Sequence, residues 1–242
     1  MNEVKSSWNE FSLACLQLGI EISDDRLEKI ISFHEMLLER NKTLNLTRIE
    51  DLDEAILKHY LDTVFLLVSL SKRDDLNGIR TVLDLGSGGG IPGVILAILL
   101  PGLERLVLVE ARNKKLAFLK EVCEHLRLPL EPVHDRWNHS RAKRWVKNFE
   151  VMDLVTARAV SEPLNLIRIL SPVVGRWLIL PRGPADGENV FRECVRESSR
   201  LGWSDGERDQ LDHRFREMSI QRQIWIWKNK KRHQTTKKDK KG

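Results

Sequence analysis

Hydrophobic residues recur every three or four positions through the first third of the chain. This spacing covers residues 3–18 and 24–41, and a third segment with the same spacing runs from about residue 51 to residue 71. A repeat near 3.6 residues is typical of helices that bury one face. No strand pattern interrupts these segments, so we predict a helical N-terminal extension over residues 1–75.

The hydrophobic pattern changes beyond residue 80. Short apolar runs, which are typical of buried strands, now alternate with helical segments. The predicted strands are residues 81–85, 105–110, 130–134, 151–156 and 177–180. Because strands that alternate with helices usually form a parallel sheet with helices on both faces, we predict an α/β domain over residues 76–228.

The last predicted strand, residues 220–228, carries the sequence Ile224-Trp225-Ile226-Trp227. We expect it to belong to an antiparallel pair that closes the sheet. We also expect Trp225 and Trp227 to face opposite sides of the sheet, with at least one of them in the core.

Composition narrows the class of protein. Of the 242 residues, 41% are hydrophobic and 31% are charged, as in ordinary globular proteins. The longest apolar stretch, residues 91–100, is too short to cross a bilayer. Cys15, Cys123 and Cys194 lack the spacing of metal ligands, so we expect buried free thiols and no metal site. These features favour a cytoplasmic protein with no membrane partner.

Most of the positive charge lies near the C-terminal end. The chain has a net charge of +5, and residues 228–241, with eight Lys or Arg and one Asp, account for +7. The rest of the chain is therefore close to neutral, at −2. We predict that residues 229–242 form a disordered basic tail, which either attracts nucleic-acid phosphates or serves only for solubility.

The strongest chemical signal follows the first predicted strand. The residues there read Asp84-Leu85-Gly86-Ser87-Gly88-Gly89-Gly90-Ile91-Pro92-Gly93. Glycine lets the main chain turn sharply and approach a ligand closely, and proline suits the first turn of a helix. Open α/β sheets bind ligands at the carboxyl ends of their strands. The loop therefore predicts a ligand site, and four close glycines disfavour a turn without a ligand.

Two cofactors fit this loop. Residues 88–93 satisfy the G-x-G-x-x-G pattern of dinucleotide sites, and Glu110 ends the second predicted strand, where it can hold ribose hydroxyls of either cofactor. Asp84 discriminates between them, because its charge would repel a pyrophosphate but attract the sulfonium of S-adenosylmethionine. We therefore predict S-adenosylmethionine, with an NAD-dependent oxidoreductase as an alternative.

Further motifs resemble those of the ribosomal RNA small subunit methyltransferase G family, also called glucose-inhibited division protein B. The resemblance runs from about residue 41 to residue 228 and includes the glycine loop with its Ile-Pro-Gly end. The other matching segments are Asn45-Leu46-Thr47, residues 56–63, Glu110 with Lys114-Lys115 and Phe118-Leu119, and residues 153–159. The resemblance implies a Rossmann-like class I methyltransferase sheet, S-adenosylmethionine as cofactor, and methylation of a guanine in 16S ribosomal RNA at nitrogen 7.

The resemblance also implies site residues. Gly86 and Ile91 fall on the family's cofactor-contacting loop positions, and Arg158 falls on its binding-site arginine. With the arguments above, the predicted cofactor-binding residues are Asp84, Gly86, Gly88, Ile91, Glu110, Trp137, Asn138 and Arg158. Trp137 and Asn138 depart from the small residue and glutamate that the family usually has near the adenine, so we expect altered adenine contacts.

The implied reaction needs no general base, because nitrogen 7 of guanine has a lone pair and no proton. Catalysis then rests on holding the reactants in line, and we assign no catalytic residue. Arg158 binds the cofactor, anchors an RNA phosphate or forms a structural ion pair, and for His59 we favour a structural role. A basic stretch either faces RNA or is a solvated surface: Arg136, Arg141, Lys143, Arg144 and Lys147.

Two further functions stay open. One is a methyltransferase with another acceptor, which the basic tail and the series of motifs disfavour. The other is a catalytically weak RNA-binding or assembly factor, which Trp137-Asn138 makes conceivable. We expect a monomer that acts on 16S ribosomal RNA or the small ribosomal subunit, since the sequence has no long heptad repeat.

Overall fold

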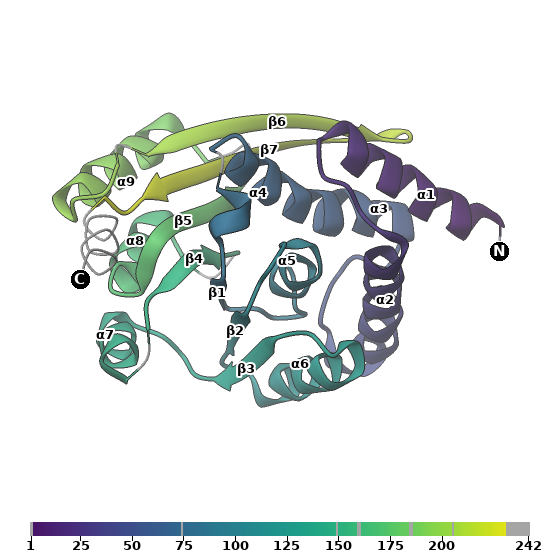
Figure 1. Cartoon of the computed structure of the whole chain (residues 1–242), viewed down its shortest axis with the longest axis horizontal. Helices are drawn as coiled ribbons and strands as arrows, with labels where there is room; N and C mark the ends of the chain where they lie inside the picture. The colour runs from purple at the N-terminus through teal and green to yellow at the C-terminus, as the bar shows by residue number, and fades with distance from the viewer. Residues whose placement is uncertain are drawn as a thin grey trace, which may run out of the picture.

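Seven strands form one sheet in the part of the chain that the computed structural model describes, residues 2–73, 75–148, 150–158, 161–183, 186–204 and 206–230 (Figure 1). The strands are β1 (Thr81–Leu85), β2 (Arg105–Glu110), β3 (Leu130–His134), β4 (Met152–Ala157), β5 (Val174–Arg182), β6 (Glu207–Phe215) and β7 (Met218–Lys228). Their order is β3-β2-β1-β4-β5-β7-β6. Strands β1 to β5 are parallel, and β7 pairs antiparallel with β5 and β6. The predicted mainly parallel sheet with an antiparallel C-terminal pair is confirmed.

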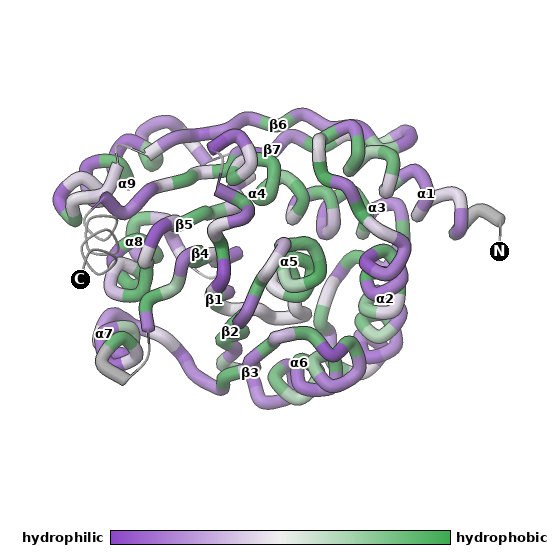
Figure 2. Tube along the Cα trace, in the orientation of Figure 1, coloured by the Kyte–Doolittle hydropathy of each residue, from purple (hydrophilic) through white to green (hydrophobic). Residues whose placement is uncertain are grey.

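Alternate residues of the strands supply two separate cores. Val82 and Leu108 belong to the core on one face of the sheet, whereas Leu83 and Val109 belong to the core on the other face. The helices over the first face include α1 (Asn2–Gln17), α2 (Asp24–Leu44), α5 (Gly93–Leu99) and α6 (Asn113–Leu126), and those over the second are α7 (His139–Asn148), α8 (Pro163–Leu170) and α9 (Glu188–Arg200) (Figure 1). Helix α5 is strongly hydrophobic (Figure 2), and all of its residues are buried.

Trp225 and Trp227 lie on the same face of β7. Both are fully buried in the second core, with ring centroids 6.4 Å apart, while Ile224 and Ile226 pack into the first core. The expectation that the two tryptophans face opposite ways was wrong. Side chains alternate along a strand, so residues two positions apart share a face.

The third predicted helix changes its winding along its length. It consists of α3 (Leu52–Ala55), a π-helical turn η1 (Ile56–Leu61) and α4 (Asp62–Ser71). Asp51 caps its start by accepting a hydrogen bond from the Glu54 N–H at 2.8 Å. Residues 62–70 are all buried, so α4 runs through the core. Turns of π-helix are rare and often lie at functional sites, and the sequence pattern did not reveal this one.

Ion pairs join the N-terminal helices to the C-terminal hairpin. Arg216, between β6 and β7, donates hydrogen bonds to Glu10 on α1 at 3.0 Å and to Asp53 on α3 at 2.7 Å. Arg73, just beyond α4, donates to Asp209 on β6 at 2.9 Å. The N-terminal extension is therefore bonded to the far edge of the sheet as well as packed against its first face.

The sequence analysis also made predictions about the C-terminal tail, the cysteines, membrane-spanning segments and metal sites. Residues 231–242, most of the predicted basic tail, lie outside the described residues. Cys15 and Cys194 are buried free thiols, and Cys123 is half-buried. Across the described ranges, no helix is long and apolar enough to cross a membrane, and no group of three or more His, Cys, Asp or Glu is arranged to hold a metal ion.

A buried histidine makes the stability of this fold depend on pH. His34 on α2 is 6% exposed, and its Nδ1 is hydrogen-bonded to the Tyr60 hydroxyl at 2.7 Å. Burial lowers the pKa of His34 from 6.5 to about 4. Between these two values the unfolded chain binds a proton that the folded chain does not, so this histidine destabilises the fold increasingly as the pH falls from 6.5 toward 4.

We predict that the variant His34→Gln, which cannot titrate, loses this contribution. Between pH 7.5 and pH 5.5 the free energy of unfolding of the wild type should fall by about 1 kcal/mol more than that of the variant. Denaturant titrations of both proteins at the two pH values measure the difference. Equal changes in the two proteins would contradict the prediction.

Candidate functional site

The predicted glycine loop connects β1 to α5 at the carboxyl end of β1. Gly86 and Gly88 have φ values of +76° and +57°, which other residues rarely adopt. At Gly93 the loop comes back against β1, where an added Cβ would lie 2.7 Å from a carboxylate oxygen of Asp84. The helix begins at Gly93, directly after Pro92. The predicted succession of strand, glycine turn and helix is confirmed.

Asp84 lies beneath this loop. The residue is 1% exposed, its Oδ2 accepts a hydrogen bond from the Gly93 N–H at 3.1 Å, and its carbonyl accepts one from the Ser87 hydroxyl at 2.9 Å. Burial raises the pKa of Asp84 to about 7, because desolvation outweighs these hydrogen bonds. Asp84 is not among the described residues that line the neighbouring cavities. Through these two hydrogen bonds Asp84 holds the glycine loop in place.

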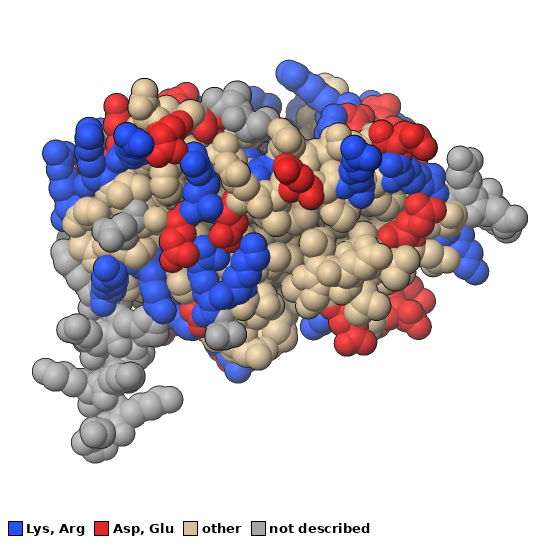
Figure 3. All heavy atoms as spheres, turned by 90° about the horizontal axis from the view of Figure 1, so that it is seen from above, with Lys and Arg blue, Asp and Glu red and all other residues tan. Residues whose placement is uncertain are grey.

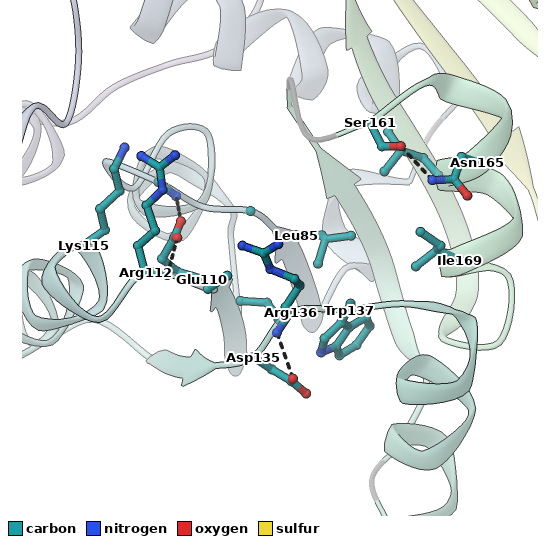
Figure 4. A pocket seen from close by; sticks show the side chains of 15 residues that line it. Leu85, Glu110, Arg112, Lys115, Asp135, Arg136, Trp137, Ser161, Asn165 and Ile169 are labelled. Atoms are coloured by element: carbon teal, nitrogen blue, oxygen red, sulfur yellow. Dashed lines mark hydrogen bonds between the residues drawn. The ribbon is translucent and has the colours of Figure 1, made fainter.

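A cavity of about 550 Å³, here called the large cavity, opens beside the loop at the carboxyl ends of β1, β2 and β3 (Figure 4). Its lining residues are Leu85, Gly86, Gly88, Val109, Glu110, Ala111, Arg112, Lys115, Asp135, Arg136, Trp137, Ser161, Asn165, Leu166 and Ile169. Four predicted cofactor residues meet here: Gly86, Gly88, Glu110 and Trp137. Sequence reasoning missed Asp135 and Asn165. Asp135 directly follows a predicted strand, which was an available signal, whereas Asn165 lies on helix α8.

Glu110 joins the end of β2 to the glycine loop. The residue is 7% exposed, and its Oε2 accepts a hydrogen bond from the Gly88 N–H at 2.9 Å. Its Oε1 accepts one from the Arg112 N–H at 2.7 Å. A carboxylate has about four acceptor positions, so Glu110 keeps capacity for hydroxyl groups of a ligand in the large cavity.

Trp137 and Asn138 have different surroundings. Trp137 is buried, lines the large cavity and lies 5.4 Å from Trp145, measured between ring centroids. Asn138 is exposed, and its Oδ1 accepts a hydrogen bond from the Arg141 N–H at 3.0 Å in the first turn of α7. Of this pair only Trp137 is among the described residues that line the cavity.

A second cavity of about 190 Å³, here called the small cavity, shares the glycine loop with the first. Gly86 and Gly88 line both cavities. The other residues of the small cavity are Leu37, Leu46, Thr47, His59, Ser87, Gly89, Ile91 and Arg158. Ile91 and Arg158, which were predicted to bind the cofactor, thus line the small cavity and not the large one. Thr47 and His59 come from the N-terminal extension.

Arg158 follows β4 and contacts the helix that contains the π-turn. Its Nη2 donates a hydrogen bond to the Lys58 carbonyl at 3.0 Å and lies 3.7 Å from Asp62 Oδ2. Burial lowers the pKa of Arg158, and the Asp62 carboxylate opposes that effect. Of the three roles considered for this arginine, the structural ion pair is therefore present, and the same guanidinium also borders the small cavity.

Comparison with solved structures identifies the fold. The METTL16 methyltransferase domain superposes with a TM-score of 0.54 at 15% identity, over 93% of this chain and 90% of that domain. An O-methyltransferase from Bacillus cereus, solved with SAH, superposes with a TM-score of 0.53 at 16% identity, over 81% of this chain and 90% of that one. The predicted class I methyltransferase fold is confirmed.

Sequence comparison identifies the family. A family model described as rRNA small subunit methyltransferase G matches residues 26–192. The ribosomal RNA small subunit methyltransferase G of Acholeplasma laidlawii is 35% identical over 168 residues, which cover 69% of each chain. That of Clostridium perfringens is 30% identical over 198 residues, which cover 80% of this chain and 78% of the relative. With a family model that spans more than half of its length and relatives at this identity, the chain is a methyltransferase of the rRNA small subunit methyltransferase G family.

Proposed function

We propose that the protein transfers a methyl group from S-adenosylmethionine to nitrogen 7 of a guanine in 16S ribosomal RNA. The observation that carries the proposal is the glycine loop shared by two cavities in a chain of this family. Gly86 and Gly88 border both cavities and have no side chains, so a ligand in either cavity can lie directly against the main chain of the loop. The predicted oxidoreductase alternative finds no support in the family.

The residues of the large cavity suit S-adenosylmethionine. Its volume of about 550 Å³ lies within the usual range for small-molecule sites. Glu110 offers carboxylate oxygens to the ribose hydroxyls, and the apolar surfaces of Val109 and Trp137 suit the flat adenine. When bound, S-adenosylmethionine supplies a methyl group that its sulfonium makes electrophilic.

The acceptor needs positioning and no proton transfer. Nitrogen 7 of guanine attacks with its own lone pair, so the protein contributes mainly by fixing the distance and the line of approach. The product ring carries a positive charge, so neutral or acceptor groups around the base favour the reaction.

Charge supports an RNA acceptor more than a protein or small-molecule acceptor. Residues 228–241 carry eight basic residues, which would attract phosphates. On α7 and just before it, Arg136, Arg141, Lys143 and Arg144 are exposed, and Arg136 lines the large cavity. On the face seen from above, basic and acidic side chains are interspersed (Figure 3). We propose 16S ribosomal RNA or the small ribosomal subunit as partner of a cytoplasmic, monomeric enzyme.

The decisive experiment offers labelled S-adenosylmethionine and small ribosomal subunits that lack the modification, followed by nucleoside analysis. We expect the label in 7-methylguanosine. Label in another nucleoside or in protein would refute the proposed acceptor. Cofactor binding without any transfer to RNA would point to a different acceptor, and the loss of both would favour the RNA-binding or assembly factor.

We predict that Glu110→Gln weakens S-adenosylmethionine binding roughly tenfold, because the amide replaces one acceptor oxygen by a donor and removes the charge. Isothermal titration calorimetry measures the affinity. Glu124→Gln, an exposed position on α6, is the matched control and should bind like the wild type. Unchanged affinity in Glu110→Gln would argue against the ribose role.

We also predict that cofactor binding changes the fluorescence of Trp137, because this indole lines the large cavity. In the variant Trp137→Phe most of the fluorescence change on adding S-adenosylmethionine should disappear. Trp203→Phe removes a buried tryptophan that lies away from the large cavity and should retain the change. The same signal in all three proteins would place the adenine elsewhere.

A further inference from the structure

The residues predicted to hold the cofactor are divided between the two cavities. Glu110 and Trp137 line the large cavity, Ile91 and Arg158 line the small one, and Gly88 lines both. Among the described residues beyond its chain neighbours, an added Cβ at Gly88 would have one heavy atom within 4 Å, a loop carbonyl oxygen at 3.7 Å. The space over Gly88 is therefore open, and a ligand with two ends can occupy both cavities.

The two ends of S-adenosylmethionine differ in their chemistry. The nucleoside end is flat and carries hydroxyl groups, which suit Glu110 and Trp137 in the large cavity. The amino-acid end carries a carboxylate and an ammonium group on a short methylene chain. The small cavity has an apolar part that suits methylene groups, formed by Leu37, Leu46 and Ile91. Its remaining side chains are polar or charged and can serve the two ionic groups.

The N-terminal extension supplies a polar wall of the small cavity. Thr47 lies between α2 and α3, and His59 lies on the π-turn η1. His59 is 8% exposed, and its burial, together with the charge of Arg158, lowers its pKa to about 4. The imidazole is therefore uncharged at neutral pH and does not repel a cation.

A chain of hydrogen bonds orients the hydroxyl group of Thr47. The Ile49 N–H donates to Thr47 Oγ1 at 3.0 Å, and the same oxygen lies 3.0 Å from His59 Nε2. His59 Nδ1 lies 3.1 Å from the Lys58 carbonyl oxygen, which can only accept, so Nδ1 carries the hydrogen of the neutral ring. The Thr47 hydroxyl therefore donates to Nε2. Its oxygen keeps one lone pair that can accept a hydrogen bond from a ligand.

Arg158 supplies a positive charge to the same cavity. Its Nη2 donates to the Lys58 carbonyl oxygen at 3.0 Å and lies 3.7 Å from Asp62 Oδ2. Asp62 also accepts a hydrogen bond from Arg222 Nε at 2.8 Å, so two guanidinium groups share its charge. A guanidinium has five N–H donors, and Arg158 therefore keeps donors for a ligand carboxylate. The small cavity thus offers a cationic donor and a neutral acceptor.

We propose that S-adenosylmethionine spans both cavities and that the N-terminal extension binds its amino-acid end. The ammonium group donates a hydrogen bond to Thr47 Oγ1, the carboxylate pairs with Arg158, and the nucleoside lies in the large cavity. His59 is a positioning residue, because it orients the Thr47 hydroxyl by accepting its hydrogen. This inference rests on the proposed function for the identity of the cofactor. It makes the extension a part of the cofactor site.

Two ligands that differ at the amino-acid end test this inference. S-adenosylhomocysteine carries that end and 5′-methylthioadenosine lacks it, while both contain adenosine and an uncharged sulfur. Thr47→Val should weaken binding of S-adenosylhomocysteine roughly tenfold, because a hydrogen bond to a charged group is lost, and leave binding of methylthioadenosine within about twofold of the wild type. Thr47→Ser keeps the hydroxyl and should bind both ligands like the wild type. Isothermal titration calorimetry measures the affinities.

Variants of His59 test its positioning role. His59→Leu removes the acceptor and should weaken binding of S-adenosylhomocysteine roughly fivefold, with methylthioadenosine unaffected. His59→Gln offers an amide oxygen in place of Nε2 and should restore most of the affinity. The matched control is Thr43→Val, the same substitution at an exposed position near the end of α2, which should bind both ligands like the wild type.

A measurement on the wild type needs no variant and decides the matter if Thr47→Val unfolds. S-adenosylhomocysteine should slow amide hydrogen exchange over residues 45–49, because its amino-acid end is bonded to this segment. Methylthioadenosine should leave the exchange of the segment unchanged.

Three results would overturn the inference while the proposed function stands. The first is unchanged affinity of Thr47→Val for S-adenosylhomocysteine, and the second is an equal loss of both ligands by the folded variant, which would show a purely structural role. The third is exchange over residues 45–49 that does not respond to S-adenosylhomocysteine. None of these measurements uses RNA. Failure of the wild type to methylate the subunits, with the ligand pattern as expected, would instead overturn the proposed acceptor and leave this inference in place.

Discussion

Two buried carboxylates hold the glycine loop on which both cavities depend. Asp84 accepts the Gly93 N–H from beneath the loop, and Glu110 accepts the Gly88 N–H from the neighbouring strand. Glycine-rich segments lose more conformational freedom on folding than any others, so such a loop needs anchors to have one shape. With both ends held, the loop presents main chain to two cavities at once. Both carboxylates therefore stabilise the conformation of the loop. Of the two, only Glu110 also lines the large cavity.

The N-terminal helices are part of the site as well as of the core. The π-turn η1 brings His59 to the small cavity and the Lys58 carbonyl to Arg158, and Asp62 follows at the start of α4. Residues 62–70 of α4 are all buried, so Asp62 is held within the core. The bonds from Arg216 to Glu10 and Asp53 join the same helices to the hairpin. Rearranging the extension would thus alter the small cavity before it altered the large one.

The departure at residues 137 and 138 has a structural explanation. Asn138 caps the first turn of α7, a role that asparagine fills well, and Trp137 packs against Trp145 from the same helix. Asn138 and Trp137 thus hold α7 beside the large cavity. The indole of Trp137 also forms part of the cavity wall. An aromatic wall binds adenine by its flat surface, whereas a glutamate would bind it by hydrogen bonds.

The sequence by itself determined which segments form helices and strands, and that the candidate site lies at the glycine loop. Strands 81–85 and 105–110 were predicted with the bounds observed, as was the glycine turn between strand and helix, because apolar runs and glycine clusters act over a few residues. Tertiary structure alone decided which residues share a cavity: Trp137 lines the large one, while Ile91 and Arg158 line the small one. It also decided that Asp62 pairs with Arg222, 160 positions away. No local pattern encodes such a contact, since it arises only when the order of strands and the burial of α4 bring distant segments together.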